Sequence, residues 1–133
     1  MTPEKFIQDF WNSSISLKAL VPTSRVITGE HDRMQAQALP CVLIDLQTDE
    51  PDYHTSSKRR RKANVRAKVW GSLSQVIAIK DALIDEQNGI HRVAWSGIGY
   101  VVSLANVTNQ YHDQQEDGEW QGISDIELDY SLN

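Results

Sequence analysis

Residues 58–87, KRRRKANVRAKVWGSLSQVIAIKDALIDEQ, contain the pattern that decides the fold. From Lys58 to Trp70 small and β-branched residues alternate with charged ones, which is typical of a strand with one buried face. The expected inner face carries Ala63, Val65, Ala67 and Val69, and the outer face carries Lys62, Arg66 and Lys68. The run therefore predicts a long strand within a sheet.

The apolar spacing changes to a helical one after Gly71. Ser72 and Gln75 form an S-x-x-Q capping box, and Asn88-Gly89 supplies a stop signal, so a helix is predicted over 73–87. Its expected apolar stripe comprises Leu73, Val76, Ile77, Leu83 and Ile84, with Ile79 at the margin.

Outward from this unit, the chain predicts one more helix and several strands. Thr2-Pro3 starts a helix whose aromatic stripe includes Phe6 and Trp11; residues 12–14 weaken it, although Leu17 and Leu20 could continue the stripe. Strands are expected over 25–28, 41–48, 90–95, 100–107 and 120–132, with polar loops near 49–58 and 109–119. We therefore expect an α+β fold, namely a mostly antiparallel sheet with two α-helices on one face and a long protruding hairpin whose tip lies near residues 50–60.

The chain has 133 residues, which is enough for a single domain over residues 1–133. Hydrophobic residues make up 40% and charged residues 23%, which excludes membrane-spanning, fibrous and wholly disordered classes. The net charge of −5 conceals a segregation: residues 1–68 carry 11 basic and 8 acidic side chains, and residues 69–133 carry 2 and 10. The single cysteine, Cys41, lies in an apolar run and is expected to be a buried hydrophobe, and nothing indicates a signal peptide.

No motif indicates catalysis, a cofactor or a metal. The Gly97-Ile98-Gly99 segment is too short for a dinucleotide loop, and the four histidines are scattered without an i,i+4 pair. Glu30-His31-Asp32 is better explained as a solvated loop, because consecutive residues rarely converge on one ion. We expect a non-enzymatic protein without cofactors.

Seven of the 13 basic residues lie within positions 58–68, as Lys58, Arg59, Arg60, Arg61, Lys62, Arg66 and Lys68. This basic run allows three interpretations: a phosphate-binding patch, an electrostatic partner for an acidic surface of another subunit, or a solvated hairpin arm. The last strand places Asp125, Glu127 and Asp129 on one face. These carboxylates are expected either to meet Lys62, Arg66 and Lys68, in the same sheet or in a neighbouring subunit, or simply to be solvated.

Four segments resemble the tail-completion proteins of long-tailed bacteriophages and prophages, the tail-terminator and head–tail joining group. They are the N-terminal helix leading into LKALV at 17–21, RVI at 25–27 followed by ALPCVLI at 38–44, VRAKVWGS at 65–72 with its helix, and IELDY at 126–130. The resemblance covers nearly the whole chain. The unusually basic segment 58–62 departs from the family pattern.

This resemblance implies a structural virion protein at the head-proximal end of the tail, assembled in the host bacterial cytoplasm. Such a protein forms a ring, often hexameric, that ends polymerisation of the tail tube protein and joins the tail to the head connector protein. DNA is only cargo passing through the lumen, and no membrane partner is implied. We expect the basic run and Asp125, Glu127 and Asp129 to form subunit or partner interfaces; the alternative is a nucleic-acid-binding accessory protein that uses residues 58–68.

Overall fold

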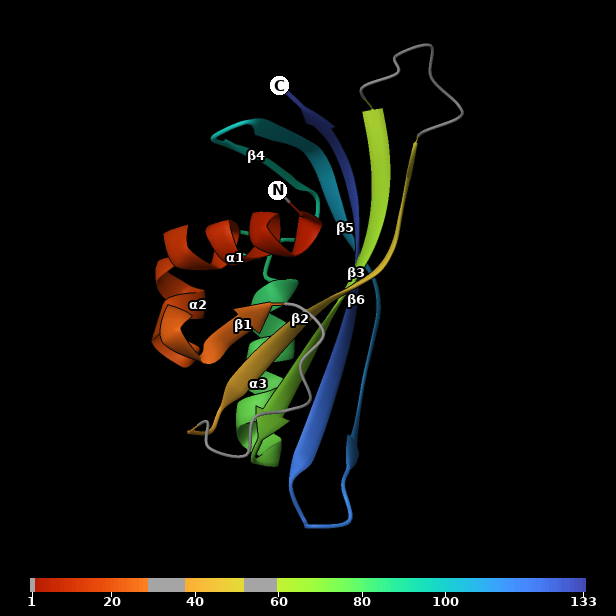
Figure 1. Cartoon of the computed structure of the whole chain (residues 1–133). Helices are drawn as coiled ribbons and strands as arrows, with labels where there is room; N and C mark the ends of the chain where they lie inside the picture. Colours follow the sequence, from red (N-terminus) through yellow and green to blue (C-terminus); the bar gives the residue numbers. More distant parts are fainter. Residues whose placement is uncertain (1, 29–37, 52–59) are drawn as a thin grey trace.

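The computed structural model describes residues 2–28, 38–51 and 60–133 (Figure 1). These residues form a six-stranded sheet, three α-helices and one short 3-10 helix. In chain order the elements are α1 (Pro3–Ser13), α2 (Ile15–Leu20), η1 (Thr23–Arg25), β1 (Val26–Thr28), β2 (Cys41–Pro51), β3 (Arg60–Gly71), α3 (Leu73–Leu83), β4 (Val93–Gly97), β5 (Tyr100–Gln114) and β6 (Trp120–Leu132).

The strand order is β1-β2-β3-β6-β5-β4. Every neighbouring pair is antiparallel except β1 and β2, which run parallel, so the sheet is mixed. The crossover through α3 carries the chain from β3 to the far edge, where β4 lies. The α+β class and the mostly antiparallel sheet are confirmed, with one parallel pair added at an edge.

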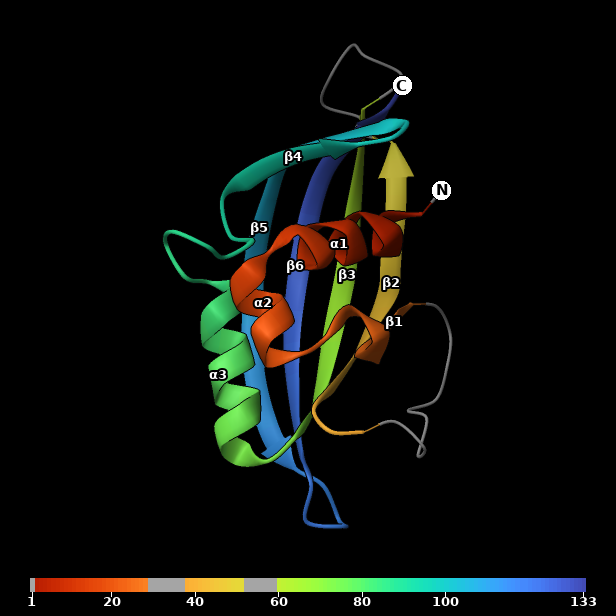
Figure 2. The same cartoon turned by 90° about the vertical axis from the view of Figure 1, so that its left-hand side faces the viewer.

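The helices cover one face of the sheet, as expected (Figures 1 and 2). In α1, Phe6 packs edge-on to Tyr130 of β6, with ring centroids 5.0 Å apart. In α3, Val76 lies over Gly122 of the same strand, where a Cβ would come within 2.6 Å of the Val76 Cγ1. Residues 122 and 130 point to the same side of the strand, since side chains alternate along it. The apolar core fills the space between this sheet face and the helices.

The expected first helix is divided in two, so the described residues contain three α-helices rather than two. Ser14 adopts an extended conformation, and its side chain accepts a hydrogen bond from the Leu17 N–H at 3.3 Å, which caps α2. Thr2 occupies the N-cap position of α1, but its side chain makes no capping hydrogen bond. Serine favours a cap over a helix interior because its hydroxyl competes for backbone hydrogen bonds.

The third helix begins as expected and ends earlier. Ser72 and Gln75 form the reciprocal capping box, and the helix stops at Leu83 rather than at residue 87. The buried residues of α3 are Val76, Ile79 and Leu83. Leu73, Ile77 and Ile84, expected in the inner stripe, are instead partly exposed, at 38%, 38% and 43%. The helix is therefore rotated so that Ile79 faces the sheet and not the solvent margin.

Two predicted polar loops are shorter than expected, because strand pairing continues into them. Residues Asp49–Pro51 belong to β2, paired as far as Pro51 with Arg61 of β3, and the tip at 52–59 lies outside the described residues. Residues 110–114 belong to β5, which pairs with β6 as far as Gln114 and Trp120. Gln110 is accommodated on the helix side because its amide donates to the Lys80 carbonyl and the Ser124 hydroxyl, both at 3.0 Å.

Candidate functional site

The sheet face opposite the helices carries the charged residues singled out in the sequence. Its central strand β3 presents Lys62, Arg66 and Lys68, and the acidic residues of two flanking strands lie beside them. The strand register brings together residues far apart in the chain: Arg66 is opposite both Asp45 of β2 and Asp125 of β6, and Lys62 is opposite Glu50 and Asp129. We call this set the charged face; it comprises Asp45, Glu50, Lys62, Arg66, Lys68, Asp125, Glu127 and Asp129.

The strongest pair on the charged face joins Arg66 and Asp125. The Arg66 Nε donates to Asp125 Oδ1 at 2.8 Å, and its Nη2 approaches Oδ2 at 3.5 Å. The two side chains are 32% and 24% exposed, so water screens the pair only partly. The hydrogen bond that Arg66 donates to Asp125 is the main reason that the pKa of Arg66 is raised above its ordinary value. Such two-pronged contacts are among the stronger charge-assisted interactions.

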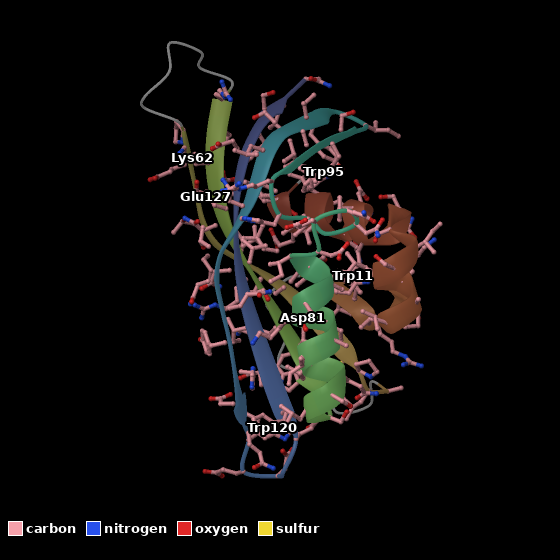
Figure 3. All side chains as sticks on the ribbon, turned by 180° about the vertical axis from the view of Figure 1, so that it is seen from behind. Trp11, Lys62, Asp81, Trp95, Trp120 and Glu127 are labelled. Atoms are coloured by element: carbon pink, nitrogen blue, oxygen red, sulfur yellow. The ribbon has the colours of Figure 1, made fainter. Side chains whose placement is uncertain are left out.

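The other cations of this face have looser partners. Lys62 Nζ lies 3.9 Å from Glu127 Oε1 and 3.7 Å from Asp129 Oδ1, with Lys62 and Glu127 shown in Figure 3. Lys68 Nζ lies 3.8 Å from Asp45 Oδ2. Of the alternatives that the sequence left open, the acidic face of the last strand pairs with the basic strand inside one sheet. Asp45 was not singled out from the sequence, although alternation from Cys41 and Leu43 places it on the same face.

Arg61 points to the opposite, helix-bearing side of the sheet. Its Nε donates to Asp49 Oδ1 at 3.2 Å, and the Tyr130 hydroxyl donates to the same oxygen at 2.7 Å. Burial and the bond to Asp49 raise the pKa of Tyr130 to about 12. The cluster ties β2, β3 and β6 together where the hairpin leaves the core, so Arg61 braces the hairpin.

The remaining members of the basic run are at the end of that hairpin. Arg60 is exposed, and its Nη2 donates to the Ser103 hydroxyl of β5 at 3.4 Å. Lys58 and Arg59 lie outside the described residues. Among the carboxylates of residues 2–28, 38–51 and 60–133, none lies within ion-pair distance of Arg60, whereas Arg61, Lys62, Arg66 and Lys68 each have one.

Beyond its charges, the same sheet face ends in an apolar cluster. Cys41, Leu43 and Trp70 are buried there, with Ile27 packed against them. Cys41 is 3% exposed, which confirms the interpretation of this residue as a small buried hydrophobe.

The histidines and the candidate metal ligands are distributed over the described ranges as follows. No group of three or more His, Cys, Asp or Glu side chains that could hold a metal occurs within residues 2–28, 38–51 and 60–133. His91 accepts from the Val107 N–H at 2.9 Å, and His112 lies 2.8 Å from Lys80 Nζ. The Glu30-His31-Asp32 segment and His54 fall outside the described residues. None of the helices in the described part has the length and apolar character needed to cross a membrane.

No family model matches the sequence. No curated protein matches it either. The structure is similar to a chain in the virion of a native gene transfer agent (GTA) particle, with a TM-score of 0.63. The superposition covers 97% of this chain and 94% of the other, at 12% sequence identity, so the two chains share their fold over nearly their full lengths.

Proposed function

We propose that this protein is a structural virion protein that caps the head-proximal end of a phage tail tube. It ends tube polymerisation and offers the surface through which the tail joins the head. It acts as a ring of identical subunits, and the resemblance to tail-completion proteins implies that this ring is a hexamer. The observation that carries this proposal is the shared fold with a chain of a gene transfer agent virion over 97% of the present chain. The four segments that resemble tail-completion proteins support the same assignment.

The distribution of charge along the sheet fits a protein that sits between two partners. Arg60 lies at one end of β3, opposite Ser131, and Gly71 at the other end lies opposite Trp120. The turn between β5 and β6 is at the second end, and it carries Glu116, Asp117 and Glu119 (Figure 1). One subunit thus presents a cation at one end and carboxylates at the other. This polarity suits a ring whose two sides meet different proteins, namely the tail tube protein and the head connector protein.

Binding to nucleic acid through residues 58–68 is the alternative function. The internal ion pairs weigh against it, because Arg61, Lys62, Arg66 and Lys68 each lie within 4 Å of a carboxylate of the same chain. A phosphate would have to displace these partners. Titration against duplex DNA at several salt concentrations separates the two functions, since a phosphate binder shows micromolar affinity with a steep salt slope.

The direct test is control of tube length. The purified protein is added to a tail tube protein as it polymerises, and tubes are measured by negative-stain microscopy. We expect shorter tubes with a ring-shaped density at one end. Tubes of unchanged length and bare ends at saturating protein would refute the capping function.

A further inference from the structure

Arg92 combines two features that the fold of its own chain does not explain. Its backbone has φ +62°, and it is the one residue other than glycine with a positive φ within residues 2–28, 38–51 and 60–133. This conformation favours glycine or asparagine over a long side chain. The Arg92 side chain is exposed, and no carboxylate in these ranges lies within ion-pair distance of it. Backbone strain of this kind clusters at functional sites.

The segment that carries Arg92 is held firmly at the entrance of β4. The Arg92 N–H donates to the Ala105 carbonyl at 2.7 Å, and the preceding His91 N–H donates to the Leu83 carbonyl at 3.3 Å. The His91 Nδ1 accepts from the Val107 N–H at 2.9 Å, so the proton of the neutral imidazole is on Nε2. Two donor groups, the guanidinium and this Nε2–H, thus have a fixed support, which lowers the entropy lost on binding.

His91 and Arg92 both border a hollow of about 510 Å³ beside the start of β4. Ile84 and Val93 supply its apolar lining. Among its described lining residues Glu86 has the only carboxylate, and because Glu86 is exposed, water screens the repulsion that it exerts. A planar guanidinium binds a carboxylate through two parallel hydrogen bonds. The hollow therefore fits a carboxylate on an aliphatic stem, such as a glutamate side chain.

Glu50 is a free carboxylate on the opposite side of the sheet. It is exposed near the end of β2, and no cation of the described part of the chain lies within ion-pair distance of it. β1 pairs only with Val42–Ile44, so none of the described strands flanks the outer side of β2 at Glu50. β4 is the last strand at the other edge, and Figure 2 shows the loop leading into β4 and strand β2 on opposite sides of the molecule. One subunit thus has a free cation on one side and a free carboxylate on the other.

We propose that Arg92 of one copy binds Glu50 of a second copy, side to side; the inference rests on the proposed ring. With a net charge of −5, two copies attract only where a free cation meets a carboxylate, and this pair supplies such a place. Neighbours in a ring meet along their sides, where Glu50 lies, whereas the acidic turn between β5 and β6 lies at an end of the sheet (Figure 1). Nucleic acid is a poorer occupant, because residues 69–133 carry 10 acidic and 2 basic side chains, which repel phosphates. Because the two partners lie on different sides, the contact is head-to-tail and generates a ring when its rotation closes.

A charge swap tests this contact. Arg92→Glu and Glu50→Arg are made singly and together, and self-association is measured by sedimentation velocity. Each single reversal should weaken association by about tenfold or more, because attraction becomes repulsion, and the double variant should return to within about threefold of the parent. Two controls are matched in charge: Lys18→Glu, at an exposed position of α2, should leave association unchanged, and Asp81→Arg should not rescue Arg92→Glu. Arg92→Gly removes the cation and the strain together, so it should weaken association without lowering the melting temperature.

Each other outcome overturns the inference in a distinguishable way. Oligomers that persist in both single variants, or a double variant no better than the single ones, would place the interface elsewhere and leave the ring standing. A lower melting temperature in Arg92→Gly would show that the fold itself needs this side chain. A parent protein that is monomeric at every concentration would remove this contact, while the tube-length assay would still report on capping.

Discussion

Removing the ion pair between Arg66 and Asp125 tests whether the charged face stabilises the subunit itself. The pair joins β3 to β6 across 59 positions of sequence, with 2.8 Å between Arg66 Nε and Asp125 Oδ1. We expect Arg66→Ala and Asp125→Ala each to lower the free energy of unfolding, and the double variant to lose less than the sum. The shortfall is the coupling energy of the pair.

The size of this coupling follows from burial and geometry. At an effective dielectric constant of about 20, two unit charges about 4 Å apart attract by about 4 kcal/mol, and desolvation and side-chain ordering cancel most of this gain. Fully exposed pairs contribute about 0.2–1 kcal/mol. Because both side chains are less than one-third exposed and the contact is two-pronged, we expect a coupling of about 1 kcal/mol, near the upper end of that range.

Urea denaturation of the parent, the two single variants and the double variant measures the coupling. The matched control is the same cycle on Lys62 and Glu127, whose charged atoms are 3.9 Å apart and whose coupling should be smaller, below about 0.5 kcal/mol. Raising the salt concentration from about 0.1 M to about 1 M shortens the screening length from about 10 Å to about 3 Å, so the exposed control pair should weaken more.

A coupling near zero for Arg66 and Asp125, or one no larger than that of the control, would refute the reasoning. The charged face would then contribute nothing to the subunit, and its pairs would be available to a neighbour.

Three further predictions concern packing, alkaline pH and the hairpin end. Gly122→Ala should lower the free energy of unfolding by about 1–3 kcal/mol, because its Cβ would lie 2.6 Å from Val76 Cγ1. Thermal unfolding measures this loss, and adding Val76→Ala should restore part of it by removing the clash. Tyr100 and Tyr130 should titrate near pH 12 by ultraviolet absorbance, since burial and carboxylate partners raise both pKa values to about 12. The unfolded chain loses these protons near pH 10, so stability should fall from about pH 10 to 12, less steeply in the Tyr130→Phe variant. Charge reversal of residues 58–60 to glutamate should impair assembly with the melting temperature unchanged, because it spares the paired Arg61 and Lys62; normal tube capping would contradict the assignment.

Short-range sequence patterns predicted the helix start, whose hydrogen bonds join residues only a few positions apart, and the main alternating strand. The Ser72–Gln75 box marks the start of α3, and both of its reciprocal bonds are present, at 3.3 and 2.9 Å. The period-two run up to Trp70 became β3. The predicted end of β5 was wrong because the residues that decide it lie far away in the chain. The strand continues to Gln114 through polar residues, since β6 supplies the backbone hydrogen-bonding partners for them.

Small residues on β6 indicate where a helix can pack against this strand. Gly122 and Ser124 interrupt the apolar face of this strand, and α3 approaches β6 closely at Gly122. The rotation of α3 follows from this approach, because Val76 and Ile79 then face the sheet. Spacing alone left Ile79 at the margin, since a helix with apolar residues around much of its circumference does not define its inner face.

The sequence by itself determined the α+β class, the buried face of β3 and the separation of charge along the chain, because these depend on periodicity and composition. Only the tertiary structure decided what the charges do. Pairing of β3 with β2 and β6 sets Arg66 beside both Asp45 and Asp125, so the basic and acidic halves of the sequence neutralise one another across a single sheet. Strand register fixes such contacts, and register depends on hydrogen bonds between segments far apart in the chain.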